Sequence, residues 1–206
     1  MLSIIIPLRN EIDNLENIKE SFNKNLENFK FEVIFINDFS TDGTFEKANL
    51  IAQENKNFKV FNNKKKGLGG AINLGINNSN GEYICIMMAD LSDDFNDLKK
   101  YYQTIKDKNL DAVFGSRFTK KSKVIDYPFK KLVLNRIFNL IVQILFLNKY
   151  NDYTNAFKIY KAKAIKNILP FVSESFNIFL EIPLKIISRK YSYEIISINW
   201  YNRKLG

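Results

Sequence analysis

Near its middle the chain reads Gly81-Glu82-Tyr83-Ile84-Cys85-Ile86-Met87-Met88-Ala89-Asp90-Leu91-Ser92-Asp93-Asp94. The apolar run 83–88 predicts a buried strand, and it stops abruptly at the acidic side chains that begin with Asp90. In open α/β sheets, ligands bind at the carboxyl ends of the strands. A carboxylate at that edge is well placed to hold a divalent metal ion against a phosphate.

Strands and helices alternate on either side of this stretch. Apolar runs predict further strands at 3–7, 31–36, 58–61 and 112–115, the first of which is expected to stop at Pro7. Helical spacing of apolar residues predicts helices at 11–29, 44–53, 71–76 and 95–105. The alternation predicts an α/β fold, with a mainly parallel sheet and helices on both faces, as a single domain over 1–206.

The second half of the chain is less regular. We expect an irregular segment at 151–157 and a final strand at 193–200. Helices are expected at 130–147, 161–169 and 176–188.

The composition excludes several classes of enzyme. The chain has 206 residues and no His, which rules out Ser-His-Asp and Cys-His nucleophilic sites and His-ligated zinc. Any metal must therefore be held by oxygen ligands, as Mg²⁺ and Mn²⁺ are. The single Cys85 lies in an apolar run, so we expect no disulfide framework and a cytoplasmic, reducing location.

The net charge of +9 suits anionic partners, although a coding bias toward Lys, Asn and Ile accounts for much of it. Nucleotides, lipid phosphates and acidic membranes are candidates. Nucleic acid is disfavoured, because most of the 18 Phe fall in apolar periodic segments rather than among basic residues.

The longest apolar stretch, 132–147, is too short to span a bilayer, and the run at 2–7 is too short for a signal peptide. A polar stripe of Asn135, Asn139 and Gln143 favours a core helix over an interfacial membrane helix. Nearby lysines would favour peripheral contact with anionic lipid at the inner face of the cytoplasmic membrane: Lys120, Lys121, Lys123, Lys130 and Lys131.

Polar groups follow several of the predicted strands. Asp38 is placed to accept hydrogen bonds from a base or ribose, whereas 40–43 is explained as a turn and helix cap. Arg117 is a candidate phosphate clamp, with a surface ion pair as the plainer alternative. The glycine-rich segment 64–70 is more simply a loop than a phosphate cradle.

Together these segments resemble family 2 glycosyltransferases of the GT-A (Rossmann-like) fold, and most of all the polyprenyl-phosphate (dolichyl-phosphate) mannosyl- and glucosyltransferases. The resemblance covers nearly the whole chain. In order, it rests on IIIPLRNE (4–11), INDFSTDGT (36–44), KGLGGAINLGI (66–76), GEYICIMMADLSD (81–93), GSRF (115–118), DYTNAFKIY (152–160), FNIFLE (176–181) and Arg203.

The resemblance implies a nucleotide-sugar-binding half at 1–118 and an acceptor-binding half at 119–206. It places Asp90 in the D-x-D motif that holds Mg²⁺ or Mn²⁺ on the donor diphosphate, with Ser92 beside it and Asp93 as a further candidate ligand. Asp90 and Arg117 would be the catalytic residues. The nucleotide sugar would contact Pro7, Arg9, Glu11, Ile36, Asp38, Ala89 and Asp90, and the phosphates and acceptor would face Arg117, Lys158 and Arg203.

This chain departs from the family pattern at several positions. Met88 replaces the first acid of D-x-D, and Asn37 replaces one of two paired acids. Relatives that glycosylate hydroxyls carry a Glu-Asp pair whose Asp is the base, and here Ile182 follows Glu181. A lipid phosphate is already ionised and needs no base. We therefore predict inverting, metal-dependent transfer of a hexose from a GDP- or UDP-sugar to a polyprenyl phosphate.

Two alternatives stay open. Met88 is compatible with a catalytically weak nucleotide-sugar-binding subunit, and the family also contains enzymes that act on hydroxyl acceptors in cell-surface polysaccharide synthesis. A membrane-protein partner or self-association is open as well.

Overall fold

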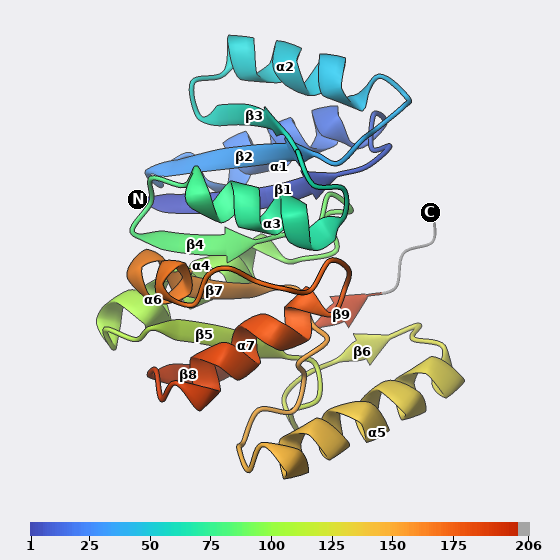
Figure 1. Ribbon diagram of the computed structural model, residues 1–206, viewed down its shortest axis with the longest axis vertical. Coiled ribbons are helices and arrows are strands. Elements are labelled where there is room, and N and C mark those ends of the chain that lie inside the picture. The colour runs from blue at the N-terminus through green and yellow to red at the C-terminus, as the bar shows by residue number, and fades with distance from the viewer. Residues whose placement is uncertain (202–206) are drawn as a thin grey trace.

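The alternating strands assemble into one seven-stranded sheet (Figure 1). The computed structural model describes residues 1–201. Neighbouring strands are parallel except at β7, which is antiparallel to both β4 and β5, so the sheet is mixed and mainly parallel, as predicted. In spatial order the strands are β3 (Phe58–Asn62), β2 (Phe31–Asn37), β1 (Leu2–Leu8), β4 (Tyr83–Ile86), β7 (Lys158–Lys161), β5 (Ala112–Ser116) and β8 (Tyr193–Ser197).

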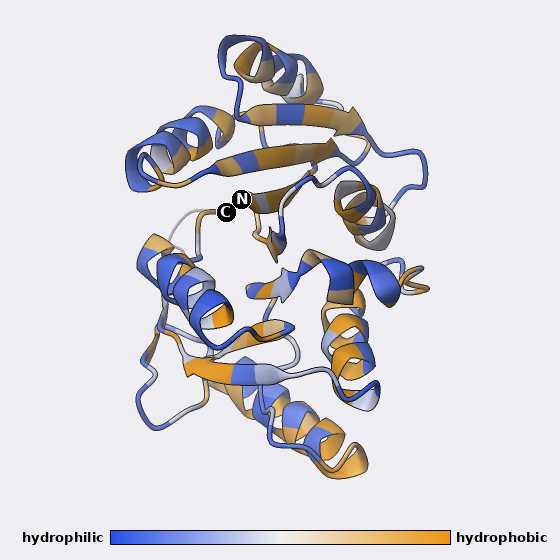
Figure 2. Cartoon of the chain, turned by 90° about the vertical axis from the view of Figure 1, so that its left-hand side faces the viewer, coloured by the Kyte–Doolittle hydropathy of each residue, from blue (hydrophilic) through white to orange (hydrophobic). Residues whose placement is uncertain are grey.

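Helices cover both faces of the sheet, and each face has its own hydrophobic layer. Adjacent residues of a strand point to opposite layers: Ile4 and Ile6 pack into one, and Ile5 packs into the other. Figure 2 shows the strands as a mostly hydrophobic layer between the helices. The first layer contains α1 (Leu15–Asn25), α2 (Thr44–Glu54) and α4 (Phe95–Asp107), and the second contains α3 (Leu68–Asn77), α6 (Ala162–Asn167) and α7 (Ile178–Ser188).

Strand β1 does not stop at Pro7, as the sequence predicted, but continues to Leu8. Ile5 accepts a hydrogen bond from the N–H of Met87, so its backbone faces β4, and Pro7 two residues later faces the same side. The pairing of β1 with β4 ends at Ile5 and Ile86. The missing N–H of Pro7 therefore leaves no ladder bond unmade.

Strand β7 lies inside the predicted irregular half and was not predicted. It is four residues long, and it begins with Lys158, which normally marks a surface position. Because β7 is antiparallel, Lys158 pairs with Ile86 at the carboxyl end of β4. The insertion brings the preceding segment 151–157 to the same edge of the sheet as the ends of β1, β2, β4 and β5.

The first helix begins at Leu15 rather than at residue 11. The backbone N–H groups of residues 11 and 12 donate to side chains of the turn before α2 and are therefore not part of a helix. The N–H of Glu11 donates to the Thr44 hydroxyl, and the N–H of Ile12 donates to the Asp42 carboxylate. Asp42 also accepts from the N–H of Thr44, the first residue of α2, so the predicted turn at 40–43 is confirmed, whereas the N-cap position itself is Gly43 and has no side-chain cap. At the other end of the chain, the predicted strand 193–200 is divided into β8 and β9 (Trp200–Tyr201).

Helix α5 (Phe129–Leu145) overturns the prediction of a core helix at 132–147. Its polar stripe faces the protein: Asn139 is buried and accepts a hydrogen bond from the N–H of Tyr153. Its apolar side faces outward, with Leu134 68% and Leu145 71% exposed. Beside α5, β9 pairs with β6 (Val124–Ile125) in a small second sheet. The outer face of α5 consists of Val133, Leu134, Ile137, Leu140, Ile141, Ile144 and Leu145.

Candidate active site

A cleft of about 330 Å³ opens at the carboxyl ends of β1, β2 and β4. Strand order reverses here, because the chain runs from β1 outward to β2 and β3 and then returns to β4 on the other side of β1. Such a switch point is where open α/β sheets bind ligands. The cleft is lined by Pro7, Leu8, Arg9, Glu11, Asp38, Gly67, Leu68, Met88, Glu174, Ser175 and Phe176.

Four of the residues predicted to contact a nucleotide sugar line this cleft together: Pro7, Arg9, Glu11 and Asp38. Two others do not. Ile36 is fully buried against the layer of α3, and Ala89 is buried in the opposite layer. Strand alternation and core packing turn both side chains away from the cleft, and the predicted contact of these two residues with the nucleotide sugar stays a prediction.

Asp38 is held in place by the loop that precedes α3. Its carboxylate accepts hydrogen bonds from the Asn63 side chain at 2.8 Å and from the N–H of Gly67 at 2.9 Å, and the residue is only 4% exposed. The backbone of Gly67 has φ +116°, which favours glycine. Asp38 therefore fixes the wall of the cleft as well as lining it.

The glycines of this loop admit a second backbone segment. The N–H of Gly69 donates to the carbonyl of Glu174 at 3.1 Å, and a Cβ on Gly69 would overlap the Ser173 carbonyl oxygen. The Lys65 amine pairs with the Glu174 carboxylate at 2.8 Å. The glycine-rich segment thus serves close packing of the loop 170–177. The prediction of a loop at 64–70 holds only as far as Gly67, because α3 begins at Leu68 and contains Gly69 and Gly70.

Asp90 follows β4 at the same edge and is half-buried. Its carboxylate accepts hydrogen bonds from the Ser92 N–H at 3.1 Å and from the Ser92 hydroxyl at 2.7 Å. The neighbouring Asp94 caps α4 through the N–H of Asn96 at 2.6 Å. Ser92 therefore orients Asp90, and Asp94 is used structurally.

Asp93 lies behind Asp90, with its Oδ2 atom buried and without a hydrogen bond from the described residues. Burial, and next the charge of Asp90, raise the pKa of Asp93 to about 7. A carboxyl group with this environment is partly protonated near neutral pH. It is a poorer metal ligand than Asp90 for that reason.

The oxygen ligands at this edge fit a metal ion that a substrate helps to hold. Within residues 1–201, no group of three or more acidic or Cys side chains could form a metal cage by itself. Mg²⁺ commonly takes one or two carboxylates together with substrate phosphates and water. Asp90, with Ser92 beside it, would supply one such carboxylate.

Arg117 follows β5 and is paired with Asp152, the first residue of the segment DYTNAFKIY, to which the sequence analysis gave no role of its own. Its Nε and Nη2 atoms donate to the two carboxylate oxygens at 2.9 and 2.7 Å, and Nη2 also reaches the Thr154 hydroxyl at 3.2 Å. Arg117 is 8% exposed and Asp152 is fully buried. The Nε and Nη2 atoms of the guanidinium are thus engaged by Asp152, and the predicted contact of Arg117 with a phosphate stays a prediction.

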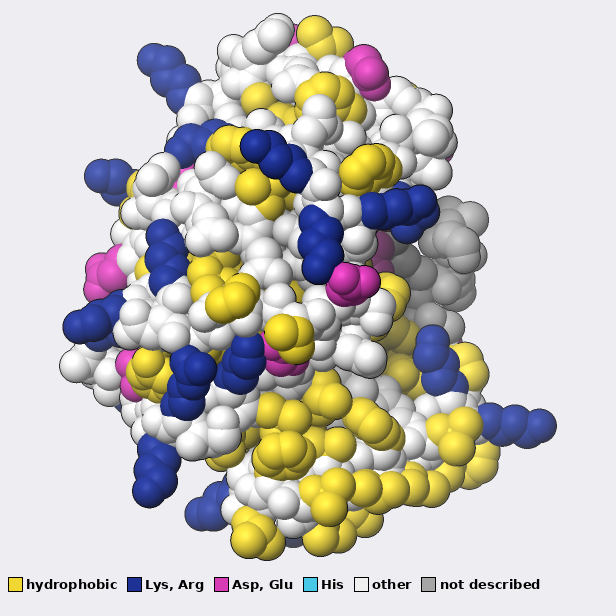
Figure 3. Space-filling view, in the orientation of Figure 1, with side chains coloured by type: hydrophobic (Ala, Val, Ile, Leu, Met, Phe, Trp, Pro, Cys, Tyr) yellow, Lys and Arg dark blue, Asp and Glu magenta, His cyan; other side chains and the backbone are white. Residues whose placement is uncertain are grey.

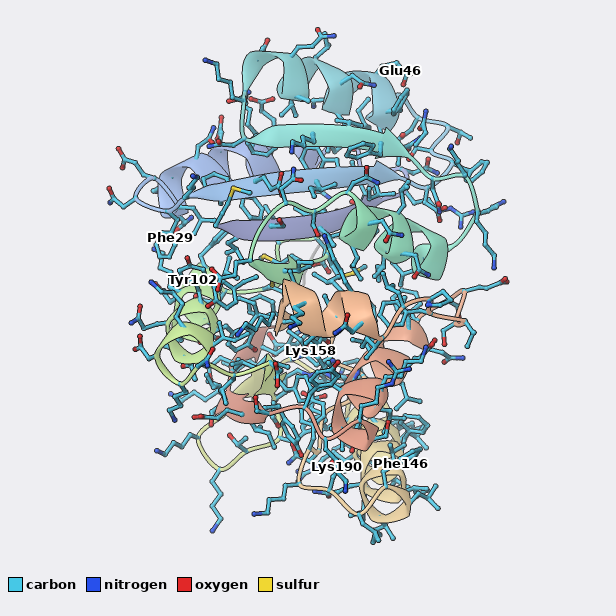
Figure 4. The ribbon with its side chains drawn as sticks, turned by 60° about the vertical axis from the view of Figure 1, so that its left-hand side comes forward. Phe29, Glu46, Tyr102, Phe146, Lys158 and Lys190 are labelled. Atoms are coloured by element: carbon cyan, nitrogen blue, oxygen red, sulfur yellow. The ribbon has the colours of Figure 1, made fainter. Side chains whose placement is uncertain are left out.

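Lys158 is buried in the middle of the molecule (Figure 4) and does not face the cleft. Its amine donates to the backbone carbonyls of Tyr153, Asn155 and Phe179. Burial lowers the pKa of Lys158 to about 7. The prediction that Lys158 faces phosphates is therefore corrected, and Arg203 lies outside the described residues.

A second cavity of about 330 Å³, which we call the Arg117 cavity, adjoins the cleft. Phe176 lines both. Sequence reasoning missed the Arg117 cavity because its walls come from α5, α7 and the loop 151–157, which touch only in the folded chain. It is lined by Arg117, Tyr127, Lys131, Asn135, Phe138, Thr154, Phe176, Asn177, Phe179 and Leu180.

Comparison with known proteins places the chain in a family. The model of the family described as "Glycosyl transferase family 2" matches residues 3–169. The chain is 30% identical to dolichol-phosphate mannosyltransferase from Pyrococcus furiosus over 135 residues, which are 66% of this chain and 38% of that protein. It is 27% identical to dolichyl-phosphate beta-glucosyltransferase from Dictyostelium discoideum over 220 residues, covering 97% of this chain and 66% of that one.

The fold is shared with solved enzymes as well. Glucosyl-3-phosphoglycerate synthase from Mycobacterium tuberculosis, solved with Mn²⁺, UDP and phosphoglyceric acid, superimposes with a TM-score of 0.75 at 14% identity. The match covers 100% of this chain and 72% of that chain. The chain spans less than two fifths of the length of the archaeal relative.

Proposed function

The chain belongs to glycosyl transferase family 2, and from that premise we propose that it transfers a hexose from a GDP- or UDP-linked donor to a polyprenyl phosphate. Two relatives are named for mannosyl or glucosyl transfer with dolichol phosphate or dolichyl phosphate. Structures of glucosyl-3-phosphoglycerate synthase contain UDP with Mn²⁺ or Mg²⁺. These names support the donor, the metal and the acceptor class that we propose here.

One observation carries the proposal: a cleft at the switch point of the sheet adjoins a second cavity that contains a buried cation. The cleft offers Arg9, Glu11 and Asp38 to a nucleotide, and the Arg117 cavity offers a cation beside apolar side chains. Asp90 stands at the same edge of the sheet. We assign the cleft to the donor and the Arg117 cavity to the acceptor phosphate.

The proposed reaction is a single displacement with inversion. An oxygen of the acceptor phosphate bonds to the anomeric carbon while the bond from that carbon to the donor diphosphate breaks. The nucleoside diphosphate leaves with the electron pair. A Mg²⁺ or Mn²⁺ ion held by Asp90 and the diphosphate would supply positive charge to the leaving group. Arg117, fixed by Asp152, contributes preorganised positive charge nearby.

A phosphate acceptor also suits the surroundings of Glu181, the residue nearest to the base position of hydroxyl-glycosylating relatives. Glu181 accepts hydrogen bonds from the N–H groups of Val172 and Ser173 and pairs with Lys185. Against the effect of burial, these partners lower the pKa of Glu181 to about 2. A carboxylate so stabilised is a poor general base, which disfavours a hydroxyl acceptor.

The test is a transfer assay with the purified chain. GDP-mannose and UDP-glucose are each incubated with a polyprenyl phosphate and Mn²⁺, and the lipid fraction is analysed by mass spectrometry. We expect a hexosyl phosphoryl lipid that disappears when EDTA is added. Hydrolysis of the donor with no lipid product under any of these conditions would refute the proposed acceptor, and a covalent glycosyl-enzyme would refute the single displacement.

Met88 favours a second candidate function, a nucleotide-sugar-binding subunit with little activity of its own. Met88 lines the cleft. It stands at the position where glycosyltransferases with the D-x-D motif carry the first acid of that motif. Stabilisation of the chain by UDP or GDP together with Mn²⁺, but no turnover with any acceptor, would support this second function instead.

We propose further that the chain works at a membrane surface. Among the helices of residues 1–201, none combines the length and hydropathy that crossing a bilayer requires. The outer face of α5 nevertheless exposes a continuous apolar surface, which Figure 3 shows over the lower part of the molecule with basic side chains projecting beside it. An apolar helix face bordered by lysines suits peripheral contact with anionic lipid. The exposed lysines in this region are Lys120, Lys121, Lys123, Lys130, Lys131 and Lys149.

A further inference from the structure

Two helices of the site each contain an asparagine with the same pair of contacts, Asn73 in α3 and Asn139 in α5. Figure 1 shows these helices above and below α7. In each, the side-chain amide donates to the backbone carbonyl four residues earlier, and the side-chain oxygen accepts the N–H of a distant loop residue. We propose that both are positioning residues, Asn73 for the donor cleft and Asn139 for Arg117. This inference rests on the proposed function, which assigns the cleft to the donor and the Arg117 cavity to the acceptor phosphate.

Asn139 holds the loop 151–157 against α5. The residue is 1% exposed, and its Oδ1 atom accepts the N–H of Tyr153 at 2.6 Å. Tyr153 is fully buried, so its N–H needs a partner inside the protein. The amide of Asn139 also donates to the Asn135 side-chain oxygen at 2.6 Å, and that oxygen accepts the Thr154 hydroxyl at 2.9 Å. Asn139 therefore fixes two successive residues of the loop, one directly and one through Asn135.

This part of the loop carries the partners of Arg117. Asp152, next to Tyr153, accepts from the Arg117 guanidinium at 2.9 and 2.7 Å and from the Arg117 backbone N–H at 2.8 Å. The Thr154 hydroxyl accepts from the same guanidinium at 3.2 Å. If the loop moved away from α5, both partners of Arg117 would move with it. Asn139 thus sets the position of the cation without touching it.

Asn73 holds the start of the loop 170–177 in the same way. Its Oδ1 atom accepts the N–H of Phe171 at 3.2 Å, and its amide donates to the carbonyl of the same residue at 3.3 Å. Because the Phe171 side chain is also buried, the backbone on both sides of its Cα atom is fixed. The loop then continues to Ser175 and Phe176, which line the cleft. Asn73 therefore fixes the point from which this wall of the cleft begins.

A purely local role in the helix does not explain these contacts. Asparagine is a poorer helix former than leucine, because its side chain competes for backbone hydrogen bonds. Asn49 in α2 shows the local arrangement alone. Its amide donates to the carbonyl of Phe45 at 2.9 Å, and within residues 1–201 its side-chain oxygen accepts no loop N–H. The loop contact distinguishes Asn73 and Asn139 from Asn49, which is therefore the matched control.

Kinetics of the purified chain separate the two roles. With a nucleotide sugar, Mn²⁺ and a polyprenyl phosphate, Asn139→Leu should lower kcat at least about tenfold and raise the KM for the acceptor, since small misplacements at a site cost up to about 100-fold. The donor KM and the Kd for UDP or GDP should stay unchanged. Asn73→Leu should instead raise the donor KM and the nucleotide Kd about fivefold, the usual effect of one lost hydrogen bond, and leave the acceptor KM unchanged. Asn49→Leu should change none of these constants.

A spectroscopic measurement tests Asn139 without any turnover. The Nε–H of Arg117 donates to Asp152, and its NMR signal can be assigned by its loss in Arg117→Lys. We expect Asn139→Leu to shift this signal, whereas Asn49→Leu and Asn73→Leu leave it in place. Thr154→Val, at an exposed position, should shift it too. Combined with Asn139→Leu, Thr154→Val should lower kcat by less than the product of the two single effects, because both act on Arg117 through one loop.

Conservative variants cover the case in which a leucine variant does not fold. Asn73→Asp and Asn139→Asp each keep the oxygen that accepts the loop N–H. Each should restore most of the altered constants toward the wild type at about pH 6, where burial favours a protonated carboxyl group at position 139 that can still donate to Asn135. Constants in the aspartate variants that are no closer to the wild type than those of folded leucine variants would contradict the loop contacts as the cause.

The outcomes separate this inference from the proposed function. No transfer to a polyprenyl phosphate by the wild type, together with the shifted Arg117 signal in Asn139→Leu and weaker nucleotide binding in Asn73→Leu, would overturn the function and support both positioning roles. Transfer by the wild type, with donor and acceptor constants changed by the same factor in both leucine variants or with an unmoved Arg117 signal in Asn139→Leu, would overturn the positioning roles and support the function.

Discussion

The charged residues of the site are mostly paired or buried before any ligand arrives. Arg117 is held by both oxygens of Asp152, and Asp38 is held by the Asn63 side chain and the N–H of Gly67. Groups fixed in this way need no reorganisation when charge develops on a substrate. The site is therefore a rigid electrostatic frame, and Asp90 is the acidic side chain of that frame that we assign to the donor.

Asp90→Asn tests that assignment at the level of one residue. The amide keeps the size of the side chain and an acceptor oxygen for Ser92, but it removes the negative charge. We expect the transfer rate to fall at least about 100-fold, as when one group that stabilises developing charge is removed from an enzyme. Calorimetry should also show the loss of Mn²⁺-dependent UDP or GDP binding. Asp94→Asn, which alters a helix cap next to the site, is the control, and equal activity of the Asp90 variant and the wild type would contradict the metal role.

Lys158 should make stability depend on pH in a predictable direction. Its pKa is about 7 in the folded chain and near 10.5 when unfolded, so between these values the unfolded chain binds one more proton. Stability from this group is therefore complete above pH 10.5 and is lost as the pH falls toward 7. Relative to Lys158→Met, the free energy of unfolding of the wild type should rise by about 1 kcal/mol per pH unit between pH 7 and 9. Urea denaturation at several pH values measures this, and parallel curves for the two proteins would contradict it.

At the scale of elements, the loop 170–177 joins the two sides of the cleft. It packs on Gly67 and Gly69 at the start of α3, and it pairs with Lys65 through Glu174. The N–H groups of Val172 and Ser173 are held by Glu181 of α7. Ser175 and Phe176 of this loop then line the cleft. The position of α7 therefore sets the shape of the cleft.

Glu181→Gln tests this connection. The variant loses the charge that holds two N–H groups and Lys185, so at pH 7 we expect a loss of about 1–2 kcal/mol in the free energy of unfolding and a higher KM for the donor. The pKa of Glu181 is about 2 in the folded chain, below its ordinary value of 4.5. The stabilisation is thus complete above pH 4.5 and is lost as the pH falls toward 2, so wild type and variant should converge there. Glu20→Gln, at an exposed position on α1, is the control, and a constant difference down to pH 2 would contradict the assignment.

How far elements can be predicted from sequence depends on whether the signal is local. Strands β1, β2 and β4 are continuous apolar runs, and the acidic or polar residues after them give the cleft edge. Strand β7 was not predicted, because its position between β4 and β5 depends on tertiary contacts. It also begins with the buried Lys158, a residue type that normally indicates an exposed position. The pair of Arg117 and Asp152 was likewise not predicted, since 35 residues separate its members.

Individual side chains of the site were predictable to a similar degree. Arg9, Glu11 and Asp38 come directly after strands, where every polar side chain is near the edge, and all three line the cleft. The burial of the Ile36 and Ala89 side chains was not predicted, because membership of a matching motif does not reveal which way a side chain points. The Arg117 cavity was not predictable at all, because its walls come from elements distant in the chain.

At the scale of the whole molecule, α5 reverses the usual orientation of an amphipathic helix. Its Asn135 and Asn139 bond to each other and to the protein, whereas its leucines and isoleucines face outward. Exposed apolar surface of this extent marks an interaction site. A bilayer is the occupant that the neighbouring lysines favour.

Liposome co-sedimentation tests this assignment. We expect the chain to bind vesicles that contain phosphatidylglycerol, to bind vesicles of phosphatidylcholine alone much more weakly, and to lose binding as salt is raised. The double variant Leu134→Glu and Ile141→Glu should weaken binding at least about tenfold, while Leu50→Glu should not. If gel filtration instead gives a dimer that the double variant converts to monomer, a second copy of the chain covers this face, and the membrane assignment is wrong.

The insertion of β7 between β4 and β5 ties the later part of the chain to the earlier part. The later part of the chain does not sit beside the earlier part as an appended module, because it threads back into the shared sheet and completes it. A cut after residue 118 would leave the first fragment with β4 and β5 separated by an empty place. The predicted donor-binding and acceptor-binding halves therefore share one sheet, and we expect that they would be difficult to exchange between relatives by swapping whole halves.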